Sequence, residues 1–502
     1  MREASYLLQR YRAMGSYLGL VVALVGTLML CPLLTLLAWP AESEVVWPFL
    51  GTGLIAVVIG LASWKLLRAK NDVVVLTIQE GGVIVLLSWL TAFGLAAIPL
   101  AILEDLSSTQ ALFESVSGWT TTGLSVVDVT RAHPATLLWR SVMQLAGGAG
   151  FAILMLAALT GQTGPSLSAA EGRSDQLVPN VRASARLVLR IYTGFVAFGV
   201  LALRAAGMGW FDAINHAFCA LSTGGFSTRV TSIGYFDSAA IEAVTIVLML
   251  LGNLNFITAW CLLRGSFRAV TRNGEIRLVA VLVPICGGLL LWLTCAPLYS
   301  SLSRASRVAI FETVTALTTT GYSTVGYGDW NSFGVLILLL LVLIGGATCG
   351  TAGGIKQFRI YLLFRGLVRE LRRPFLPRTS VVDDSTYEGE ERVPLTDARL
   401  RTIGVFVFLY LGVWLCGAAV LAAWGFTLRD SLFELASALG TVGLSVGVTA
   451  PDAPWPVLWT EMVAMFLGRL EFFVIIASAA KLVRDGVVLG RSSRRAQRPG
   501  NS

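Results

Sequence analysis

The chain has 502 residues, of which 55% are hydrophobic and only 14% are charged. Its mean hydropathy of +0.73 is typical of polytopic membrane proteins and argues against a string of soluble domains. The net charge of +8 follows from the placement of basic residues around apolar segments, so it indicates no nucleic-acid partner.

Ten apolar segments are each long enough to cross a bilayer core of about 30 Å. They lie at 16–39, 47–66, 75–103, 135–160, 185–206, 238–264, 276–300, 333–364, 400–424 and 457–483. The first is too long for a secretory signal core and is followed at once by a second, so we expect it to be retained. Most of the 38 Lys and Arg residues fall on the side of both termini, which the positive-inside rule places in the cytoplasm. The sequence thus predicts a multi-pass protein of the cytoplasmic (inner) membrane, surrounded by lipid.

A short motif, T-x-G-x-S, follows an apolar segment four times in the chain. Its copies are Thr121/Gly123/Ser125, Thr223/Gly225/Ser227, Thr319/Gly321/Ser323 and Thr441/Gly443/Ser445. The spacing between copies is too long for a solenoid repeat and indicates that one small domain is repeated four times. We predict an all-α fold with a two-helix prefix and four pseudo-symmetric repeats of helix, pore half-helix, filter and helix around one pore. The expected boundaries are 1–72 for the prefix and 73–180, 181–272, 273–398 and 399–502 for the repeats.

The chemistry of the motif suits a dehydrated monovalent cation, which needs several oxygen ligands around one axis. Glycine tolerates the positive dihedrals that such a backbone requires, and threonine adds a stiff side chain with a hydroxyl oxygen. Non-helical backbone is allowed at membrane depth only where it lines a cavity or is buried in protein. The predicted cation-binding residues are therefore Thr121, Thr122, Gly123, Thr223, Gly224, Gly225, Thr319, Thr320, Gly321, Thr441, Val442 and Gly443.

The third copy is followed by a second candidate, because Thr324–Asp329 spells T-V-G-Y-G-D, the signature of tetrameric potassium channels. Nine residues before each motif glycine stand Glu114, His216, Glu312 and Glu434, and this common frame selects Gly321 as the filter glycine. The T-V-G-Y-G-D string has no counterpart in the other repeats. We predict that it forms a loop at the outer mouth.

Each half-helix has a candidate N-cap ahead of its filter, and the four are Thr109, Asp212, Ser306 and Asp430. A half-helix entering from outside would point its partially negative C-terminal end toward the membrane centre, which favours a cation there. Two roles remain open for the three glutamates of the common frame. They could satisfy the outer end of the half-helix, or they could attract cations directly.

Two features of the later repeats suggest a gate. The second helix of the third repeat is interrupted by a glycine-rich run, whose proposed gating residues are Gly345, Gly346, Thr348, Gly350, Thr351, Gly353 and Gly354. Each glycine costs a helix about 1 kcal/mol relative to alanine, although close packing of helices is the alternative explanation. Arg469 is a charge in the middle of the last apolar segment. It either pairs with a buried acid or lines the pore as a barrier or latch.

Other polar positions are less specific. Gln144, Asn253 and Asn255 lie at comparable depths and fit either a cavity wall or hydrogen bonds between helices. Residues 370–401 form the longest polar insert, which is either a linker or a docking surface for a cytosolic subunit.

The combined motifs resemble the Trk/Ktr/HKT superfamily of potassium transporters. The residues that carry this resemblance are the four T-x-G-x-S copies, G-G-A-T-C-G-T-A-G-G-I-K at 345–356, G-N-L-N-F at 252–256 and G-R-L-E at 468–471. The two-segment prefix is similar to the Trk branch. The resemblance implies a homodimer with one pore per protomer, a cytosolic nucleotide-binding regulatory subunit, and potassium as the transported ion at the filter residues, without a tightly bound organic cofactor. It also implies that the glycine-rich run is the gating loop and that Arg469 lines the pore.

Three functions remain to be compared. Potassium uptake is favoured, because relatives that carry sodium often have serine at the first filter glycine and this chain has Gly123. A sodium or mixed cation pathway is the alternative within the same superfamily. A membrane-embedded enzyme is disfavoured, because no apolar segment carries paired carboxylates, a histidine cluster or a nucleophile with its base, and the seven cysteines include no C-x-x-C pair.

Overall fold

The structure, a computed structural model, describes residues 2–68, 77–150, 181–348, 350–375, 385–388, 391–470 and 472–496. Helices account for most of this part of the chain, as the composition predicts. The strands that it includes are β1 (Ser385–Glu388) and β2 (Glu391–Pro394), which pair antiparallel with Ser385 opposite Pro394. This hairpin lies in the polar insert after the short helix η5 (Arg373–Phe375), so the insert contains more than a plain linker.

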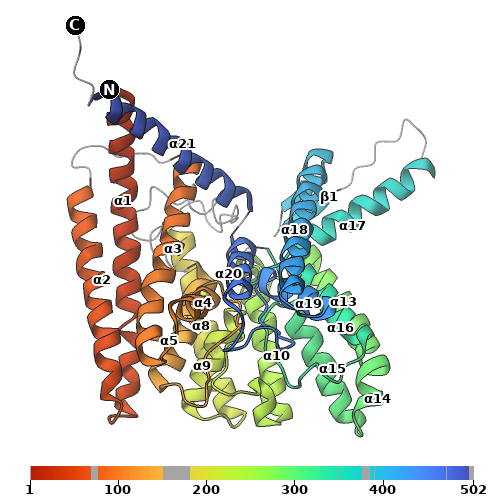
Figure 1. Cartoon of the computed structure of the whole chain (residues 1–502). Helices are drawn as coiled ribbons and strands as arrows, with labels where there is room; N and C mark the ends of the chain where they lie inside the picture. Colours follow the sequence, from red (N-terminus) through yellow and green to blue (C-terminus); the bar gives the residue numbers. More distant parts are fainter. Residues whose placement is uncertain are drawn as a thin grey trace.

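The prefix is a pair of long helices, α1 (Arg2–Leu28) and α2 (Val46–Leu67), connected through η1 (Cys31–Leu37) and η2 (Ser43–Val45). They pack along each other at one side of the molecule (Figure 1). A Cβ atom on Gly60 would lie less than 3.0 Å from the backbone of Gly19 and Ala23. Small residues therefore allow the two helices to approach closely, as they do in other membrane helix pairs.

After the prefix, the same order of elements occurs four times: a long helix, a short helix, a turn and a second helix. The long helices are α3 (Ile78–Leu103), α8 (Val181–Ala205), α13 (Gly274–Leu290), which continues through η4 (Leu291–Cys295) and α14 (Ala296–Leu298), and α18 (Asp397–Ala423). The short helices are α4 (Ser108–Trp119), α9 (Trp210–Leu221), α15 (Leu302–Leu317) and α19 (Leu428–Leu439). The second helices are α5 (Pro134–Ala149), α10 (Ala239–Asn253), α16 (Ser332–Ile344) and α20 (Trp455–Arg469).

The four units close into a ring. The second helix of each unit contacts the short helix of the next one: α5 contacts α9, α10 contacts α15, α16 contacts α19, and α20 returns to α4. The last contact joins the fourth unit to the first. The turns after the short helices approach one another within this ring.

The apolar segments that contain the second helices of the last three repeats are interrupted, and one of these breaks was predicted. The segment predicted at 238–264 is broken between α10 and α11 (Phe256–Leu263), with a bend of 115°. The segment predicted at 457–483 bends by 105° between α20 and α21 (Phe472–Ala496). The segment predicted at 333–364 ends at Ile344 and resumes as α17 (Gln357–Arg372). The prediction of one continuous helix was wrong for the 238–264 and 457–483 segments, whereas the interruption predicted at the glycine-rich run of the third repeat is confirmed.

Local backbone chemistry explains these breaks. Leu254 has an extended conformation, and the Asn255 side chain accepts a hydrogen bond from the Ile257 amide at 2.8 Å, so it caps a new helix. Leu470 is extended after α20. In the first repeat α5 ends at Gly150, whose φ of +60° is a left-handed cap, and residues 151–180 lie outside the described part of the chain.

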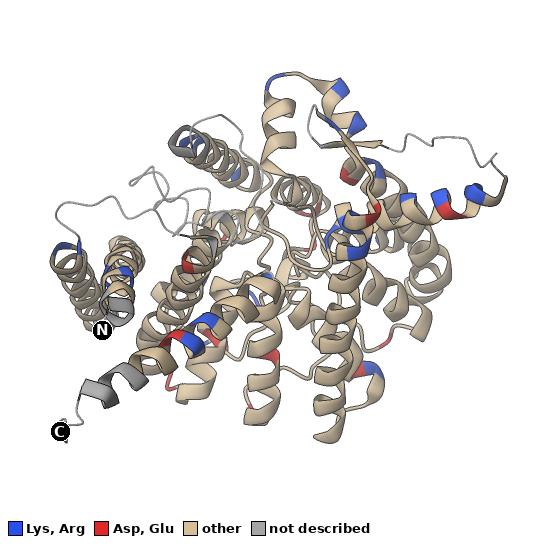
Figure 2. Cartoon of the chain, turned by 90° about the horizontal axis from the view of Figure 1, so that it is seen from above, with Lys and Arg blue, Asp and Glu red and all other residues tan. Residues whose placement is uncertain are grey.

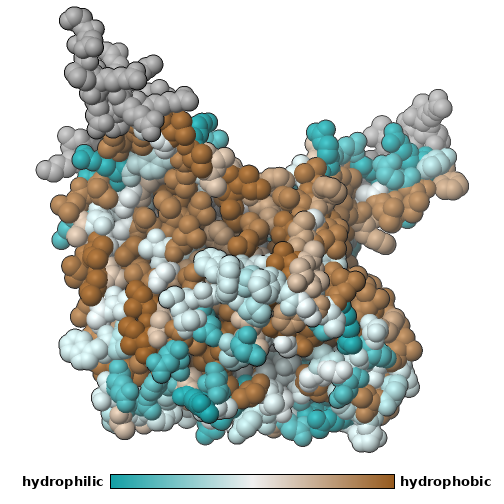
Figure 3. Space-filling model, in the orientation of Figure 1, coloured by the Kyte–Doolittle hydropathy of each residue, from teal (hydrophilic) through white to brown (hydrophobic). Residues whose placement is uncertain are grey.

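Within the described residues, six helices are long and apolar enough to cross a membrane, or up to eight if each bent pair counts as one span. The predicted count of ten is not reproduced, partly because of the breaks. Figure 3 shows a broad hydrophobic band across the face in view, with hydrophilic surface toward its lower end. α1 begins and α21 ends at the opposite, upper end (Figure 1), and Figure 2, seen from that end, shows Lys and Arg at the outer ends of its helices. The small helix α12 (Phe267–Arg272) carries some of this charge.

Candidate functional site: a ring of four turns

Each short helix ends in the same unusual cap. In the first repeat, the amide of Thr122 donates to the carbonyl of Ser117 at 2.9 Å and that of Thr121 donates to Gly118 at 3.1 Å. This pair of bonds is a Schellman motif, which usually places glycine at its left-handed position. Here the position holds threonine in all four repeats: Thr121 (φ +56°), Thr223 (+52°), Thr319 (+54°) and Thr441 (+48°). A left-handed non-glycine residue costs about 1–3 kcal/mol, and such strain gathers at functional sites.

The motif glycines meet one another in cyclic order. Gly123, Gly225, Gly321 and Gly443 all have positive φ, between +74° and +97°. A Cβ atom on any of them would lie less than 3.0 Å from a carbonyl oxygen of the next repeat, and the four oxygens belong to Gly224, Thr320, Val442 and Thr122 in that order. Since the oxygen of Thr122 closes the circle on Gly443, all twelve predicted cation-binding residues lie together. Only glycine fits where another backbone comes so close.

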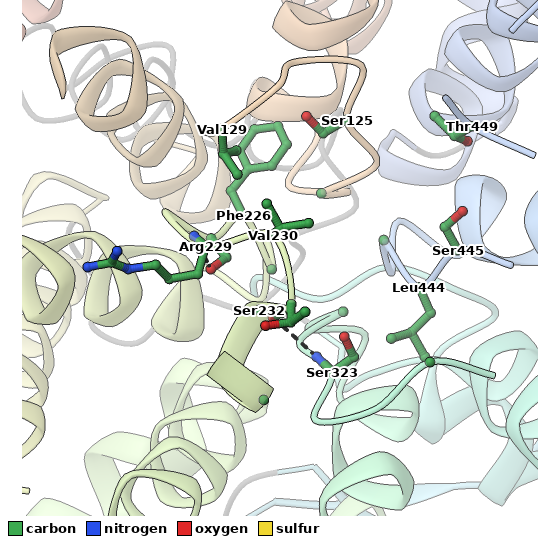
Figure 4. A pocket seen from close by; sticks show the side chains of 18 of the residues that line it. Ser125, Val129, Phe226, Arg229, Val230, Ser232, Ser323, Leu444, Ser445 and Thr449 are labelled. Carbon is green, nitrogen blue, oxygen red and sulfur yellow. Dashed lines mark hydrogen bonds between the residues drawn. The ribbon is translucent and has the colours of Figure 1, made fainter. Parts of the chain in front are cut away.

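The outer side of this ring opens into one cavity of about 890 Å³. All four motif glycines line it, together with Ser125, Ser227, Ser323 and Ser445. Figure 4 shows residues from the four repeats around this space, among them Ser125, Phe226, Ser323 and Ser445. The threonines of the motif are absent from the lining. The ring therefore has an outer end of glycine and serine and an inner end of threonine.

The acids of the common frame hold the chain that follows each turn. Glu114 accepts hydrogen bonds from the Ser125 hydroxyl and the Val126 amide, both at 3.0 Å. Glu434 repeats this pattern with Ser445 at 2.6 Å and Val446 at 2.9 Å. All four frame residues are fully buried. The predicted role at the helix end was wrong, because the carboxylates lie inside the short helices and bind the strand that follows each turn. Their role in cation attraction stays a prediction.

The other two frame residues show variants of the same arrangement. His216 lies 2.9 Å from the Ser227 hydroxyl through Nε2 and 2.8 Å from the Asp212 carbonyl through Nδ1. The histidine therefore keeps the contact with the motif serine without a carboxylate. Glu312 accepts from the amide and hydroxyl of Thr324, both at 2.8 Å.

The T-V-G-Y-G-D string lies outside the ring, in agreement with the predicted outer loop. A Cβ atom on Gly326 or Gly328 would meet no atom within 4 Å. The Tyr327 hydroxyl donates to Glu312 at 2.6 Å, so this string helps to hold the acid of its own repeat. The frame residues thus identify the glycine that enters the ring correctly.

The N-caps of the short helices differ from the predicted residues. The helices are capped by Ser107, Gly209, Ser301 and Thr427, which precede the predicted Thr109, Asp212, Ser306 and Asp430 by two to five residues. Ser107 and Gln110 form a capping box. Asp430 lies in the first turn, and its amide donates to Thr427, so a good capping type was mistaken for the cap itself.

The glycine-rich run of the third repeat forms a compact loop, here called the inner loop (residues 345–355), in which Cys349 lies outside the described residues. The Gly346 amide donates to the Gly353 carbonyl at 3.0 Å and closes the loop on itself. Asn253 accepts from the Ala347 amide at 2.9 Å, and Glu275 accepts from the Thr348 amide at 2.6 Å. The loop is therefore fastened to the break in the second repeat and to the start of α13.

The remaining proposed gating residues lie around this loop. Gly345 and Gly354 have φ of +72° and +83°, and a Cβ atom on either would meet the other at less than 3.0 Å. A Cβ atom on Gly350 would come within 3.2 Å of the Asn253 carbonyl. The Thr351 hydroxyl donates to the Gly252 carbonyl at 2.9 Å. These glycines therefore pack the loop on itself and on the second repeat, rather than packing two continuous helices together.

Arg469 joins the last repeat to the first. Its Nη2 donates to the carbonyls of Gly147 at 2.7 Å and Gly148 at 3.1 Å, and its guanidinium lies 5.8 Å from the Trp89 ring. Carbonyls at a helix C-terminus favour a positive charge, so α5 supplies part of the compensation that this partly buried charge needs. The neighbouring Glu471 lies outside the described residues.

Gln144 and Asn253 make hydrogen bonds between elements, one of the two explanations given for them. Gln144 donates to the Gly224 carbonyl at 2.5 Å and accepts from the Phe226 amide at 3.2 Å, so these two hydrogen bonds fix the turn of the second repeat to α5. Asn253 binds the inner loop, and Asn255 caps α11. A metal-ligand cluster of three or more His, Cys, Asp or Glu is absent from the described residues. A cation in this ring would therefore meet backbone and hydroxyl oxygens.

Several functional contacts escaped the sequence reasoning. Arg140 forms a buried ion pair with Glu114 at 2.6 Å, which the sequence did not predict. Glu461 on α20 lies 3.1 Å from the Thr449 hydroxyl, which also contacts Glu434 at 2.7 Å. The distance along the chain hides both partnerships, although a lone acid or arginine within an apolar segment is a signal that such a partner exists.

The comparisons with known proteins agree with this architecture. The model of the TrkH family, described as a cation transport protein, matches residues 49–489. This chain belongs to the TrkH family. The Trk system potassium uptake protein TrkH of Escherichia coli is 32% identical over 483 residues, covering 93% of this chain and 98% of the relative. An uncharacterized cation transporter of Methanocaldococcus jannaschii is 28% identical over 469 residues, covering 93% and 94%.

A solved structure extends the agreement to three dimensions. The crystal structure of the potassium transporter TrkH from Vibrio parahaemolyticus matches with a TM-score of 0.79 and 30% sequence identity, covering 93% of this chain and 98% of the other. The resemblance to the Trk branch is therefore confirmed, and the chain is a multi-pass membrane protein. Members of the TrkH family are transport proteins, which also confirms that the chain is not an enzyme.

Proposed function

We propose that this TrkH-family protein takes up potassium across the cytoplasmic membrane through the ring of four turns. The single observation that carries the proposal is the cyclic contact of Gly123, Gly225, Gly321 and Gly443 with carbonyls of the neighbouring repeats at the base of one cavity. Four oxygen-bearing turns around one axis can replace the hydration shell of a monovalent cation. The relatives named as potassium uptake proteins support potassium as the ion.

The inner loop is the proposed gate of this pathway. It lies against the inner, threonine end of the ring, whereas the cavity opens on the outer end. When the loop moves, its hydrogen bonds to Asn253 and Glu275 can break and be replaced by others. Arg469, which bridges to the end of α5, acts in this proposal as a latch between the fourth and first repeats.

The proposal includes partners and orientation. A homodimer and a cytosolic nucleotide-binding subunit are expected from the Trk branch, and the relatives' designation as part of a Trk system supports a partner. The location of the ends of α1 and α21 at one end of the molecule supports a common cytoplasmic side for both termini. The outer cavity then faces away from the cytoplasm.

Cation flux tests this function directly. In cells that lack potassium uptake, the full chain should restore growth at low potassium and take up rubidium in preference to sodium. In proteoliposomes with opposed gradients, a reversal potential set by potassium would support a passive potassium pathway. A reversal potential set by sodium would replace the proposal by the alternative, a sodium or mixed cation pathway. Absence of any cation flux in both systems would contradict it.

A further inference from the structure

The inner loop contacts three of the four left-handed threonines at the inner end of the ring. The Thr351 hydroxyl lies 3.0 Å from the Thr223 hydroxyl. The Gly353 amide donates to the Thr319 hydroxyl at 3.1 Å. A Cβ atom on Gly353 would lie less than 3.0 Å from the Thr441 hydroxyl, so the loop backbone packs directly on the fourth repeat. These contacts lie between the loop and the ring itself, in addition to those that fasten the loop to α13 and to the second repeat.

The threonine hydroxyls divide into two pairs. Those of Thr223 and Thr319 are engaged by the loop, whereas those of Thr121 and Thr441 are fully buried and have no hydrogen-bond partner among the described residues. An unpaired buried hydroxyl costs free energy unless a ligand satisfies it. Four hydroxyl oxygens at equivalent positions, two unpaired and two held by a loop, form a cation site that is only partly free.

We propose that closure of the inner loop and binding of a cation at the threonine level of the ring exclude each other. The loop places an amide donor on the Thr319 hydroxyl and its backbone against Thr441. A cation at this level would need the same threonine oxygens as ligands and the same space on the ring axis. This inference rests on the proposed function of the ring. It assigns Thr351 and Gly353 as the residues that connect gate and filter.

The exclusion makes the coupling reciprocal. If the cation binds only when the loop has moved, then the cation favours opening, and anything that weakens closure strengthens cation binding by the same factor. Potassium would therefore promote its own passage, and a cation-free ring would stay covered. The link is local, because it runs through side chains already in contact.

Potassium affinity of the purified full chain tests this coupling. Thr351→Val removes the loop hydroxyl but keeps its shape and every filter residue. Because one hydrogen bond contributes about 0.5–1.5 kcal/mol, the potassium affinity, measured by calorimetry or by the potassium-dependent shift in thermal unfolding, should rise about two- to tenfold. Gly353→Ala, whose Cβ would clash with Thr441, should raise it at least as much.

Thr348→Val is the matched control in the same loop, since the Thr348 hydroxyl has no partner among the described residues. Because this hydroxyl makes no hydrogen bond within the described part of the chain that could hold the loop closed, the control should leave closure unchanged and the potassium affinity within twofold of the wild type. Equal affinities in wild type, Thr351→Val and Gly353→Ala would overturn the inference and leave the proposed function intact. An equal rise in the Thr348→Val control would also overturn it. Absence of potassium binding in every variant would instead contradict the proposed function.

Discussion

The glycines of the ring and those of the T-V-G-Y-G-D string differ in the space around them. A Cβ atom on Gly321 would press into the Val442 carbonyl, whereas one on Gly326 would meet nothing within 4 Å. Gly321 also has a φ of +81°, a conformation that side-chain-bearing residues rarely adopt. Sequence similarity to potassium channels favours the second string, but its geometry is that of a surface loop.

Replacement of Gly321 by serine should therefore weaken the preference for potassium over sodium. We expect a loss of about tenfold or more, which corresponds to ~1.4 kcal/mol of discrimination, because the added Cβ forces the Val442 carbonyl out of the ring. Gly326→Ser is the matched control and should change the preference little. Competitive rubidium and sodium uptake in transport-deficient cells measures both. A silent Gly321→Ser together with a damaging Gly326→Ser would show that the wrong glycine has been placed in the ring.

Replacement by glutamine should affect the stability of the protein differently at two buried glutamates of the fourth repeat. Glu434 accepts hydrogen bonds from the amides of Val446 and Thr449 and from two hydroxyls. In Glu434→Gln, the new NH₂ group would face some of these donors, and those hydrogen bonds would be lost. We expect this replacement to lower the free energy of unfolding by roughly 1–3 kcal/mol. Glu461 contacts the Thr449 hydroxyl, to which a glutamine can donate, so Glu461→Gln should stay within about 0.5 kcal/mol.

Thermal unfolding of the two variants in detergent separates these cases. Wild-type-like stability of Glu434→Gln would mean that the carboxylate does not hold the descending strand. A large loss for Glu461→Gln would mean that its partner needs a negative charge.

At the scale of elements, glycines on the second helices decide how closely these helices approach the short ones. A Cβ atom on Gly147, Gly252 or Gly468 would lie less than 3.0 Å from the carbonyl of the last residue of the short helix in its own repeat: Trp119, Leu221 or Leu439. In the third repeat the Gln357 side chain donates to the equivalent carbonyl of Leu317 at 3.3 Å. The helix that follows thus covers the end of the short helix in three repeats, and in the third repeat the Gln357 side chain at the start of α17 takes its place.

Gly468→Ala should destabilise the protein for this reason. Forcing a methyl group into a filled site costs about 1–3 kcal/mol, and the only relief is to move α20 away from α19. Gly486→Ala on α21, where a Cβ would meet nothing within 4 Å, is the control and should be neutral or stabilising by about 0.4–1 kcal/mol. The thermal unfolding midpoints of the two variants should therefore move apart, and equal midpoints would contradict the packing described.

The ring could be predicted because its requirements are local. Each T-x-G-x-S copy contains a glycine that permits left-handed backbone and close approach of another backbone, together with a threonine that supplies a hydroxyl. The frame residue stands nine positions before the glycine in every copy. The helix breaks at Asn253–Asn255 and at Leu470 could not be predicted in the same way. Their sequences, G-N-L-N-F and G-R-L-E-F, contain glycine and, in the first, asparagine, which weaken a helix without having to end it, so tertiary partners decide whether it continues. The Arg140–Glu114 pair and the contact between Glu461 and Thr449 could not be predicted either, because they join residues whose proximity depends on how each repeat folds.

At the scale of the whole molecule, the closed order of contacts gives the protein an outer end with a cavity and an inner end with a loop. Both the start of α1 and the end of α21 lie at the end opposite to the cavity loops (Figure 1). This polarity agrees with the basic residues on the terminal side. In the orientation that we propose, the pathway is open toward the outside and covered toward the cytoplasm.

Reporter fusions test this polarity. A fluorescent protein that folds only in the cytoplasm should fluoresce when joined after Ala496, whereas alkaline phosphatase, active only outside, should be inactive there. Alkaline phosphatase inserted at Arg131, in the exposed loop before α5, should be active. The reverse pattern would turn the cavity toward the cytoplasm and exclude uptake by the route described.

The location of the cation tests the central claim most directly. Crystals of the full chain grown with thallium or rubidium in place of potassium would reveal these ions by anomalous scattering. We predict peaks on the axis of the ring, between the turns that carry Gly123, Gly225, Gly321 and Gly443. Ordered ions elsewhere in the membrane region, with none between these turns, would contradict the account.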